Sequence, residues 1–235
     1  MLNTRWLNPD PPAVAAFQTR HPFPWQDFDG FLEEEAFQEL RRTFPSRARF
    51  ELHRGLRRGG GQRSHDRYYL AYEQSPYHRR SADMPDDSPG VIHHHELAPA
   101  WQRFLADLQS AGFLAHLEGR LGQRPRLRFA WHLSFEGSEV SPHLDSAGKL
   151  GTHIFYFNDA DDWDDAWGGR TLLLADKRTE RPNPEFSEFG EVLSPSMLGN
   201  RSLLFQRTPT SWHGVERLSC PRDHYRKTFH VIAER

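Results

Sequence analysis

The second half of the chain alternates between apolar and polar residues, and this alternation restricts the fold more than any other feature. From residue 127 to 135, apolar side chains stand at every second position: Leu127, Phe129, Trp131, Leu133 and Phe135. A period of two is typical of a β-strand with one buried face. Further strand-like runs cover residues 152–158, 170–174, 202–206 and 227–233. Turn-forming residues separate these runs, which predicts several short strands in a sandwich or barrel.

Helices are expected mainly before this region. Residues 31–44 place apolar side chains on one helical face, with acidic residues in the first turn. Residues 99–121 repeat apolar side chains at spacings of three and four, which predicts one long amphipathic helix. Because strands and helices do not alternate as βαβ units, we expect a mainly β fold. The prediction is one domain, residues 1–235, with a helical N-terminal layer over about 1–122 and a β core over about 123–235.

Composition excludes some classes of function. The chain has 30 basic and 32 acidic side chains and a formal charge of −2. No overall field therefore attracts nucleic acid or an anionic membrane. No apolar run approaches the roughly 18 residues of a membrane span, and the N-terminus does not resemble a signal peptide. The only cysteine, Cys220, offers no disulfide and no thiolate zinc site, so we expect a soluble, cytoplasmic protein.

Metal chemistry in this chain would use histidine and carboxylate ligands. His143 and Asp145 are two residues apart, so in an extended segment both side chains project to the same side. His213, which follows the predicted strand 202–206, is the candidate for a third ligand. Two imidazoles and one carboxylate leave three positions open, as in non-haem Fe(II) oxygenases. The alternative is that His143 and Asp145 cap a turn and that His213 is an ordinary core histidine.

The surroundings of these ligands resemble a known family. Four blocks carry the resemblance: Phe135-Glu136-Gly137 ahead of His143-Leu144-Asp145; residues 152–158; Trp167-Gly168-Gly169; and Trp212-His213-Gly214-Val215 followed by Arg226-Lys227-Thr228. In order and spacing they resemble the 2-oxoglutarate/Fe(II) dioxygenases, specifically the prolyl-hydroxylase-like branch. The resemblance covers roughly residues 127–235. It implies a double-stranded β-helix core, of the jelly-roll or cupin type, with the metal at the open end of the barrel.

The resemblance also implies the cofactors and their ligands. Fe(II) would be held by His143, Asp145 and His213, with 2-oxoglutarate and O2 as co-substrates. Arg226 would bind the distal carboxylate of 2-oxoglutarate, because an arginine fork donates two parallel charge-assisted hydrogen bonds. Thr228 shares a strand face with Arg226, and Tyr156 stands where relatives place a tyrosine that reaches the co-substrate. Arg222 and Arg217 are rivals for the role of Arg226, and relatives often have tyrosine in place of Phe135.

The implied reaction is hydroxylation of a C–H bond with release of succinate and CO2. Relatives that halogenate have a small residue in place of Asp145, so the carboxylate favours hydroxylation, and no catalytic residue beyond the metal site is expected. The substrate, a small molecule or a peptidyl group, is not encoded in any motif. Three alternatives stay open: a nucleic-acid repair demethylase, a non-catalytic barrel that only binds, and a zinc hydrolase. The first is disfavoured because Ile232 stands where its members carry a further arginine.

Several other residues have candidate roles. Lys149, His153 and Val215 are candidates for substrate or co-substrate contact. Residues 53–67, rich in Gly and Arg, are interpreted as a solvated loop, with a lid or an anion-docking patch as the alternative. The run His93-His94-His95 is interpreted as a loop rather than a second metal site. The acidic run 159–165 is expected to be a solvated loop, with calcium binding as the alternative.

Overall fold

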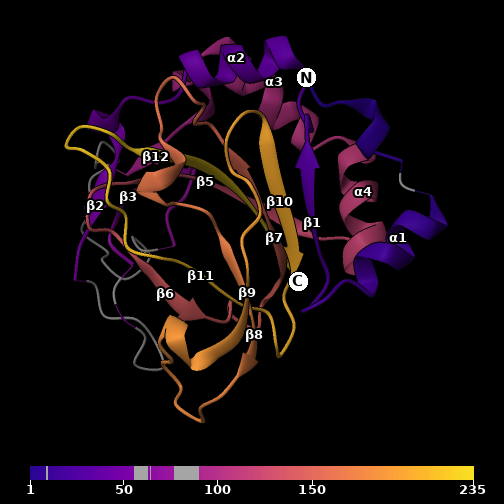
Figure 1. Cartoon of the computed structure of the whole chain (residues 1–235). Coiled ribbons are helices and arrows are strands. Elements are labelled where there is room, and N and C mark those ends of the chain that lie inside the picture. The colour runs from indigo at the N-terminus through magenta and orange to yellow at the C-terminus, as the bar shows by residue number, and fades with distance from the viewer. Residues whose placement is uncertain (9, 56–62, 64, 77–89) are drawn as a thin grey trace.

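Two β-sheets packed face to face form the core of the structure, a computed structural model that describes residues 1–8, 10–55, 63, 65–76 and 90–235 (Figure 1). The larger sheet has the order β1 (Trp25–Asp29), β10 (Arg201–Gln206), β7 (Lys149–Tyr156), β12 (Arg226–Glu234), β5 (Arg126–Ser134), β3 (Arg67–Tyr72) and β2 (Glu51–His53). Strand β4 (Val91–Ile92) pairs with β3 in parallel, and the other pairs are antiparallel. The smaller sheet has the order β6 (Val140–His143), β11 (Trp212–Val215), β8 (Leu172–Lys177) and β9 (Phe189–Leu193).

Four helices cover the outer face of the larger sheet: α1 (Pro11–Gln18), α2 (Glu34–Arg42), α3 (Pro99–Leu108) and α4 (Ala111–Leu121) (Figure 1). Short 3-10 turns lie at Thr4–Trp6, Arg47–Arg49, His94–Glu96, Asp165–Trp167 and Phe186–Glu188. Aromatic side chains dominate the interface between helices and sheet. Trp101 of α3 packs edge-on against Trp131 of β5, with ring centroids 5.2 Å apart, and also contacts Phe229 of β12. Burial of each such side chain stabilises the fold by roughly 1.5–3 kcal/mol.

A second apolar cluster lies between the two sheets, inside the barrel. It joins Ile154 of β7 and Leu203 of β10 to Leu173 of β8 and Val215 of β11. Successive residues of a strand point to opposite faces, so each strand of the larger sheet directs its side chains alternately into the barrel and toward the helices. Along β12, Phe229 packs under the helices, whereas its neighbours in the alternating register point into the barrel.

The predicted fold class is confirmed, with differences in the N-terminal half. The expected helix 99–121 is two helices, because Ser110 interrupts it and caps α4 by accepting a hydrogen bond from the Phe113 amide at 3.3 Å. The helix expected over 31–44 is shorter, Glu34–Arg42. The described part of the first 122 residues also contributes four strands, β1 to β4, that widen the larger sheet. These strands have two to six residues, too few for a clear period.

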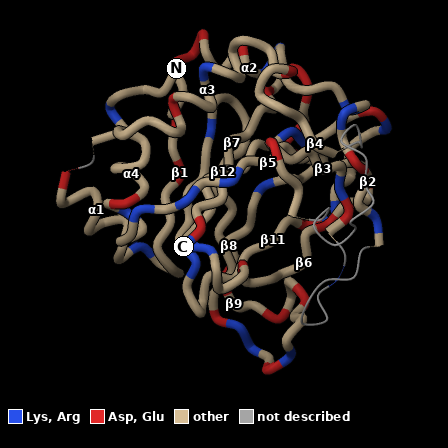
Figure 2. The backbone as a smooth tube through the Cα atoms, turned by 180° about the vertical axis from the view of Figure 1, so that it is seen from behind, with Lys and Arg blue, Asp and Glu red and all other residues tan. Residues whose placement is uncertain are grey.

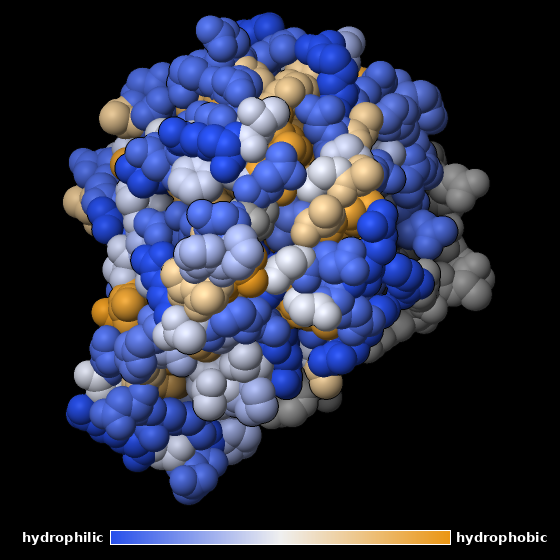
Figure 3. Space-filling model, turned by 90° about the vertical axis from the view of Figure 1, so that its right-hand side faces the viewer, coloured by the Kyte–Doolittle hydropathy of each residue, from blue (hydrophilic) through white to orange (hydrophobic). Residues whose placement is uncertain are grey.

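The surface carries both charges. Basic and acidic positions are scattered over the backbone tube in Figure 2, in keeping with the balanced composition. The face in Figure 3 is mainly hydrophilic, with small apolar areas separated from one another. Within the described residues, no helix has both the length and the apolar character needed to cross a membrane.

Candidate metal centre

Three side chains from two neighbouring strands and the segment after β6 converge inside the barrel. His143 ends β6, Asp145 follows it, and His213 lies on β11 directly opposite His143 in the antiparallel register. Each offers one ligand atom, and these atoms lie within 4.8 Å of one another. A metal ion with ligand bonds of about 2 Å would draw adjacent ligand atoms to about 3 Å from one another, so the side chains would move inward on metal binding. The three side chains are 6–9% exposed, and no other such cluster occurs among the described residues.

Both histidines are oriented in the same way. The Nδ1 atom of His143 lies 2.9 Å from the Ser141 carbonyl oxygen, and that of His213 lies 3.0 Å from the Ser211 carbonyl oxygen. A carbonyl can only accept, so each Nδ1 carries the proton and each Nε2 keeps a lone pair. This is the tautomer that a metal ligand requires. Burial lowers the pKa of His213, although Asp145 and the Ser211 carbonyl oppose the shift, so this imidazole stays neutral near pH 7.

Asp145 is held by contacts to both carboxylate oxygens. Lys149 Nζ donates to Oδ1 at 2.6 Å, and the Thr152 hydroxyl donates to Oδ2 at 3.0 Å. Burial alone would raise the pKa of this carboxyl, but Lys149 and the two histidines outweigh it and hold the pKa well below its usual range. The Arg207 guanidinium also donates to the Asp145 carbonyl oxygen at 3.1 Å. The carboxylate is therefore ionised and oriented, as a hard metal ligand must be.

Gly214 permits the close approach of β11 to β6 beside the ligands. The register shifts between His213 and Val215, and a Cβ on Gly214 would lie 2.7 Å from the Val140 carbonyl oxygen. No larger residue fits there without moving the backbone. Within the predicted block 212–215, Gly214 therefore has a steric role, because it lets the two strands that carry the histidines lie close together.

Arg226 is a buried cation in the same interior. It is 4% exposed, and no carboxylate pairs with it within the described part of the chain. Its Nε donates to the Gly169 carbonyl oxygen, and Nη2 donates to the Thr171 hydroxyl at 3.1 Å. The Tyr156 hydroxyl reaches the same Thr171 oxygen at 2.8 Å. A buried charge without a counter-ion is costly, so this group of a guanidinium and two hydroxyls fits a carboxylate ligand.

Comparison with known proteins was made by sequence and by structure. No protein-family model matches the chain, and no curated protein matches it in sequence. Solved structures do match. A prolyl-4-hydroxylase from Pseudomonas putida has a TM-score of 0.61 at 15% identity, over 95% of this chain and 98% of that chain. The chain therefore has the prolyl-hydroxylase-like 2-oxoglutarate/Fe(II) oxygenase fold, with the His-x-Asp and His triad in place.

Two further matches broaden this comparison. A prolyl hydroxylase from Trichoplax adhaerens, in complex with a hypoxia inducible factor oxygen degradation domain peptide fragment, has a TM-score of 0.59 at 14% identity, over 94% of this chain and 86% of that one. The non-heme alpha-ketoglutarate-dependent carbocyclase SnoK of nogalamycin biosynthesis has a TM-score of 0.59 at 11% identity, over 97% and 85% of the two chains. At these identities the likeness establishes the fold, and the matched proteins differ in the reaction named.

Within this fold, the other predicted contact residues divide into three groups. Lys149 lies at the centre, as the ion-pair partner of Asp145 rather than as a free group. Val215 is buried in the apolar cluster between the sheets. The prediction for His153 is wrong: its Nε2 bonds to the Ser202 hydroxyl at 3.0 Å, and its ring packs against Phe31 under the helices, on the far side of the larger sheet.

The co-substrate candidates from β12 lie where the strand pattern puts them. Thr228 faces the barrel interior, with its hydroxyl 3.0 Å from His230 Nε2. The rivals Arg222 and Arg217 are exposed and lie before β12, outside this interior. Phe135 contacts the ring of Tyr68 at a centroid distance of 5.4 Å.

Sequence reasoning missed two interior histidines. His132 of β5 and His230 of β12 lie ring against ring, with centroids 4.0 Å apart. Burial lowers the pKa of each well below the usual value, and their mutual proximity and Arg226 add to the effect for His132. The Nε2 atom of His132 is buried and has no hydrogen-bond partner among the residues that the structure describes. Their even spacing from Ser134 and Thr228 was the available signal, since alternate residues of a strand share a face.

The three remaining segments that the sequence singles out contain ion pairs. Residues 56–62 and 64 of the Gly- and Arg-rich segment lie outside the described residues, so the prediction for 53–67 stays open; Arg63 pairs with Glu139 and Glu185. His93 pairs with Glu73 at 2.8 Å, and the three adjacent histidines form no metal cluster in the part of the chain described. In the acidic run, Asp162 pairs with Lys227 and Arg41, so cations of the chain itself already balance it.

Proposed function

We propose that the protein is an Fe(II)- and 2-oxoglutarate-dependent oxygenase that hydroxylates a C–H bond and releases succinate and CO2. The observation that carries the proposal is the convergence of His143, Asp145 and His213 in one interior. This interior also contains Arg226, a buried cation with no carboxylate partner among the described residues. An arginine binds a carboxylate through two parallel hydrogen bonds, so a co-substrate with one carboxylate for Arg226 and further oxygen atoms for the metal would use both groups.

Each residue has a distinct task in this proposal. The two histidines present Nε2 lone pairs, because their Nδ1 protons are held by carbonyl oxygens. Asp145 supplies the negative charge, kept ionised by Lys149 and oriented by Thr152. Arg226 would hold the distal carboxylate of 2-oxoglutarate. The bound iron with its two co-substrates would supply the oxidising chemistry, while the barrel excludes water from it.

Hydroxylation is the proposed outcome among the reactions that this fold supports. The carboxylate of Asp145 occupies the position that a halide would need, which favours transfer of oxygen. The matched carbocyclase is described as alpha-ketoglutarate dependent as well, so the product must be determined. Mass spectrometry separates the cases: we expect a gain of one oxygen atom, whereas ring closure removes two hydrogen atoms. A product without added oxygen would contradict hydroxylation and leave the cofactor proposal standing.

The first experiment tests the cofactor proposal directly. Anaerobic addition of Fe(II) and 2-oxoglutarate to the wild type should produce a weak visible charge-transfer band, and His213→Ala should abolish it. His95→Ala, at an exposed histidine, is the matched control and should keep the band. If the folded wild type shows no band and no 2-oxoglutarate-dependent succinate release, the proposed function is wrong. Restoration of a hydrolytic activity by Zn(II), but not by Fe(II), would favour a zinc hydrolase.

The substrate can be sought with the same assay. Peptidyl prolines are one group to screen, because the Trichoplax relative was solved with a peptide fragment. Free amino acids and small polar metabolites are the other. We expect a true substrate to raise succinate release above the uncoupled rate. A His132→Phe variant would show whether the polar inner wall of β5 contacts it, since only substrate-stimulated turnover should fall.

A further inference from the structure

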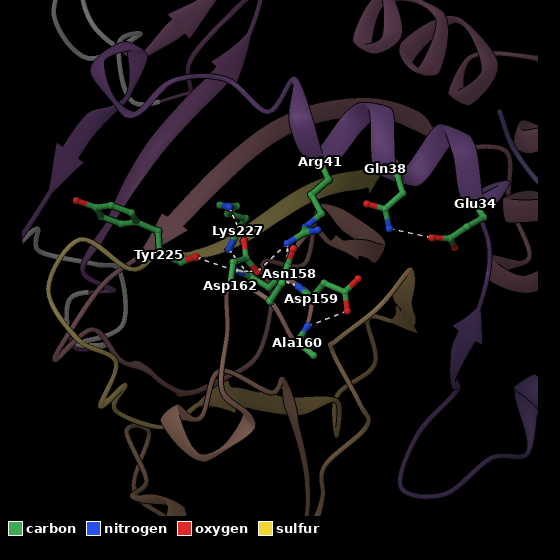
Figure 4. Close-up of polar contacts among 10 residues, drawn as sticks. Glu34, Gln38, Arg41, Asn158, Asp159, Ala160, Asp162, Tyr225 and Lys227 are labelled. Carbon is green, nitrogen blue, oxygen red and sulfur yellow. Dashed lines mark hydrogen bonds and ion pairs between the residues drawn. The ribbon is translucent and has the colours of Figure 1, made fainter.

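The side chain of Asn158 prolongs the β7–β12 ladder by one step. The last backbone bond of this pair runs from the Phe157 amide to the Lys227 carbonyl oxygen, at 3.0 Å. One residue later, Asn158 Oδ1 accepts from the Lys227 amide at 2.6 Å, and Nδ2 donates to the Tyr225 carbonyl oxygen at 3.0 Å (Figure 4). A carboxamide has the donor and acceptor of a peptide group. It therefore substitutes for the backbone that β7 no longer provides.

The residue enclosed by these two bonds is Arg226. Tyr225 precedes it and Lys227 follows it, so Asn158 holds the backbone on both sides of the arginine. On the opposite edge of the strand, Arg226 pairs with Ser134 of β5. The start of β12 is thus supported from two sides at the residue that would bind the co-substrate.

The chain needs this support because β7 ends just where Arg226 begins β12. The paired part of β7 stops at Tyr156, opposite Thr228. After Asn158 the backbone turns away, with the Trp163 amide bonded to the Asp159 carbonyl oxygen at 3.0 Å. Without the carboxamide, two peptide groups beside Arg226 would lose their partners, and strand ends without partners fray. Asn158 is fully buried, so water does not replace it readily.

A layer of ion pairs lies behind this contact. Lys227 Nζ donates to Asp162 Oδ2 at 2.6 Å, and Asp162 also pairs with Arg41 of α2 (Figure 4). The Asp162 carboxylate accepts from the Asp159 amide at 2.9 Å and so fixes the turn that carries Asn158. Lys227 and Asp162 are about a quarter exposed, and a pair of this kind stabilises a fold by about 1 kcal/mol or less. Among the described residues, neither side chain bonds to Arg226. Because Asp162 also accepts from Asn158 Nδ2 at 3.4 Å, Lys227 is the better control.

We propose that Asn158 is a positioning residue that sets the depth and direction of the Arg226 guanidinium for the distal carboxylate of the co-substrate. The inference rests on the proposed function, because it assigns Asn158 a role in 2-oxoglutarate binding. Arg226 must align with the Gly169 carbonyl and the Thr171 hydroxyl at the same time, and a shift of its backbone would disturb both. Catalytic constellations tolerate displacements of only about 0.5 Å.

The test compares two metal-chelating anions under anaerobic conditions with Fe(II). 2-Oxoglutarate has a distal carboxylate for Arg226, whereas oxalate chelates metal and has none. For Asn158→Ala we expect the Kd of 2-oxoglutarate to rise about tenfold, and that of oxalate to stay within about twofold, since one to two net hydrogen bonds are lost. The KM for 2-oxoglutarate should rise with little change in kcat at saturation. The matched control Lys227→Met should leave both affinities within about twofold.

Two outcomes would overturn the inference. One is a folded Asn158→Ala protein with wild-type affinity for 2-oxoglutarate. Another is an equal loss for both anions, which would mean that the metal centre itself is damaged. If the alanine variant does not fold, the isosteric Asn158→Asp, which lacks the donor to Tyr225, serves instead and must show the same selective loss. A wild type that binds neither anion would refute the proposed function itself, a result that is distinct from all of these.

Discussion

Thr152 and His153 are neighbours on β7, yet they meet different surroundings. Thr152 points into the barrel, where its hydroxyl bonds to the Asp145 carboxylate. His153 points to the helices, where one ring nitrogen bonds to Ser202. The other, Nδ1, is buried and has no partner in the described part of the chain. Under the helices the imidazole packs among aromatic rings, whereas inside the barrel the Thr152 hydroxyl is one of the groups that orient Asp145.

Two of the buried arginines repeat this difference. Arg226 on the inner side and Arg120 on the outer side are 4% and 1% exposed, and neither has a carboxylate partner among the described residues. Burial lowers the pKa of Arg120 to about 10 and also lowers that of Arg226. Arg120 bonds to the Gln26 side chain at 3.2 Å and lies over the ring of Phe28. Burial of a charge is therefore not evidence of function by itself. Convergence with the triad singles out Arg226.

Exchange of each arginine for methionine would test this distinction most strongly. We expect Arg226→Met to raise the Kd of 2-oxoglutarate by about 100-fold, because charge-assisted hydrogen bonds worth about 3 kcal/mol in all are lost. Arg120→Met should leave that Kd unchanged, and its free energy of unfolding should equal or exceed that of the wild type, since apolar replacements of buried charges are often neutral or stabilising. Calorimetric titration and urea unfolding measure the two quantities. If both variants changed the Kd of 2-oxoglutarate equally, Arg226 would have no special role in binding it.

Acidification should lower the stability of the core between the helices and the larger sheet, because His116 of α4 is buried there. Its Nδ1 donates to the Trp6 carbonyl oxygen, and its Nε2 finds no partner within the described residues. Arg120 and His153 lie beside it. Burial and the Arg120 cation lower its pKa to about 3. The unfolded chain binds this proton near pH 6.5 and the folded chain only near pH 3, so stability is complete above about pH 6.5 and declines as the pH falls.

The expected loss through His116 is about 2 kcal/mol between pH 7 and pH 5. Other buried histidines add to the acid sensitivity of the wild type, so the variant His116→Phe is needed to isolate this one. Its free energy of unfolding should depend less on pH by that amount in the same interval. Parallel pH profiles for the two proteins would show that His116 is protonated in the folded state as readily as in the unfolded chain.

The parts that the sequence predicted well are local in character. The period of two over residues 127–135 becomes β5, and the spacing of His143 and Asp145 brings both to one side of the chain. The prediction that His153 contacts substrate conflicts with strand alternation. Residues 153 and 156 are three positions apart, so with Tyr156 in the barrel interior His153 must lie on the opposite face.

Other features depend on contacts between distant segments and have no local signal. Strand β1 pairs with β10 across most of the chain, and its five residues do not reveal that partner. Thr171 joins the site only because the start of β8 brings it to Arg226. A threonine just before a strand carries no sequence signal of such a contact. Asn158 marks the end of a strand in the sequence, but its bonds around Arg226 require the register of β12.

The smallest expected effect comes from removing a single hydroxyl group on either face of the larger sheet, Thr152 of β7 on the barrel side and Ser202 of β10 on the helix side. Thr152→Val keeps the shape of the side chain and removes its bond to Asp145, so the carboxylate loses one of its two orienting contacts. Loss of such a contact costs metal affinity, and we expect the Kd of Fe(II), or of a redox-stable divalent surrogate, to rise about tenfold. Ser202→Ala removes the matching bond to His153 on the outer face and should leave that Kd unchanged. If both variants weakened metal binding alike, the sheet would transmit disturbance between its faces, and the separation of a functional interior from a structural one would fail. If neither did, Lys149 alone would suffice to orient Asp145.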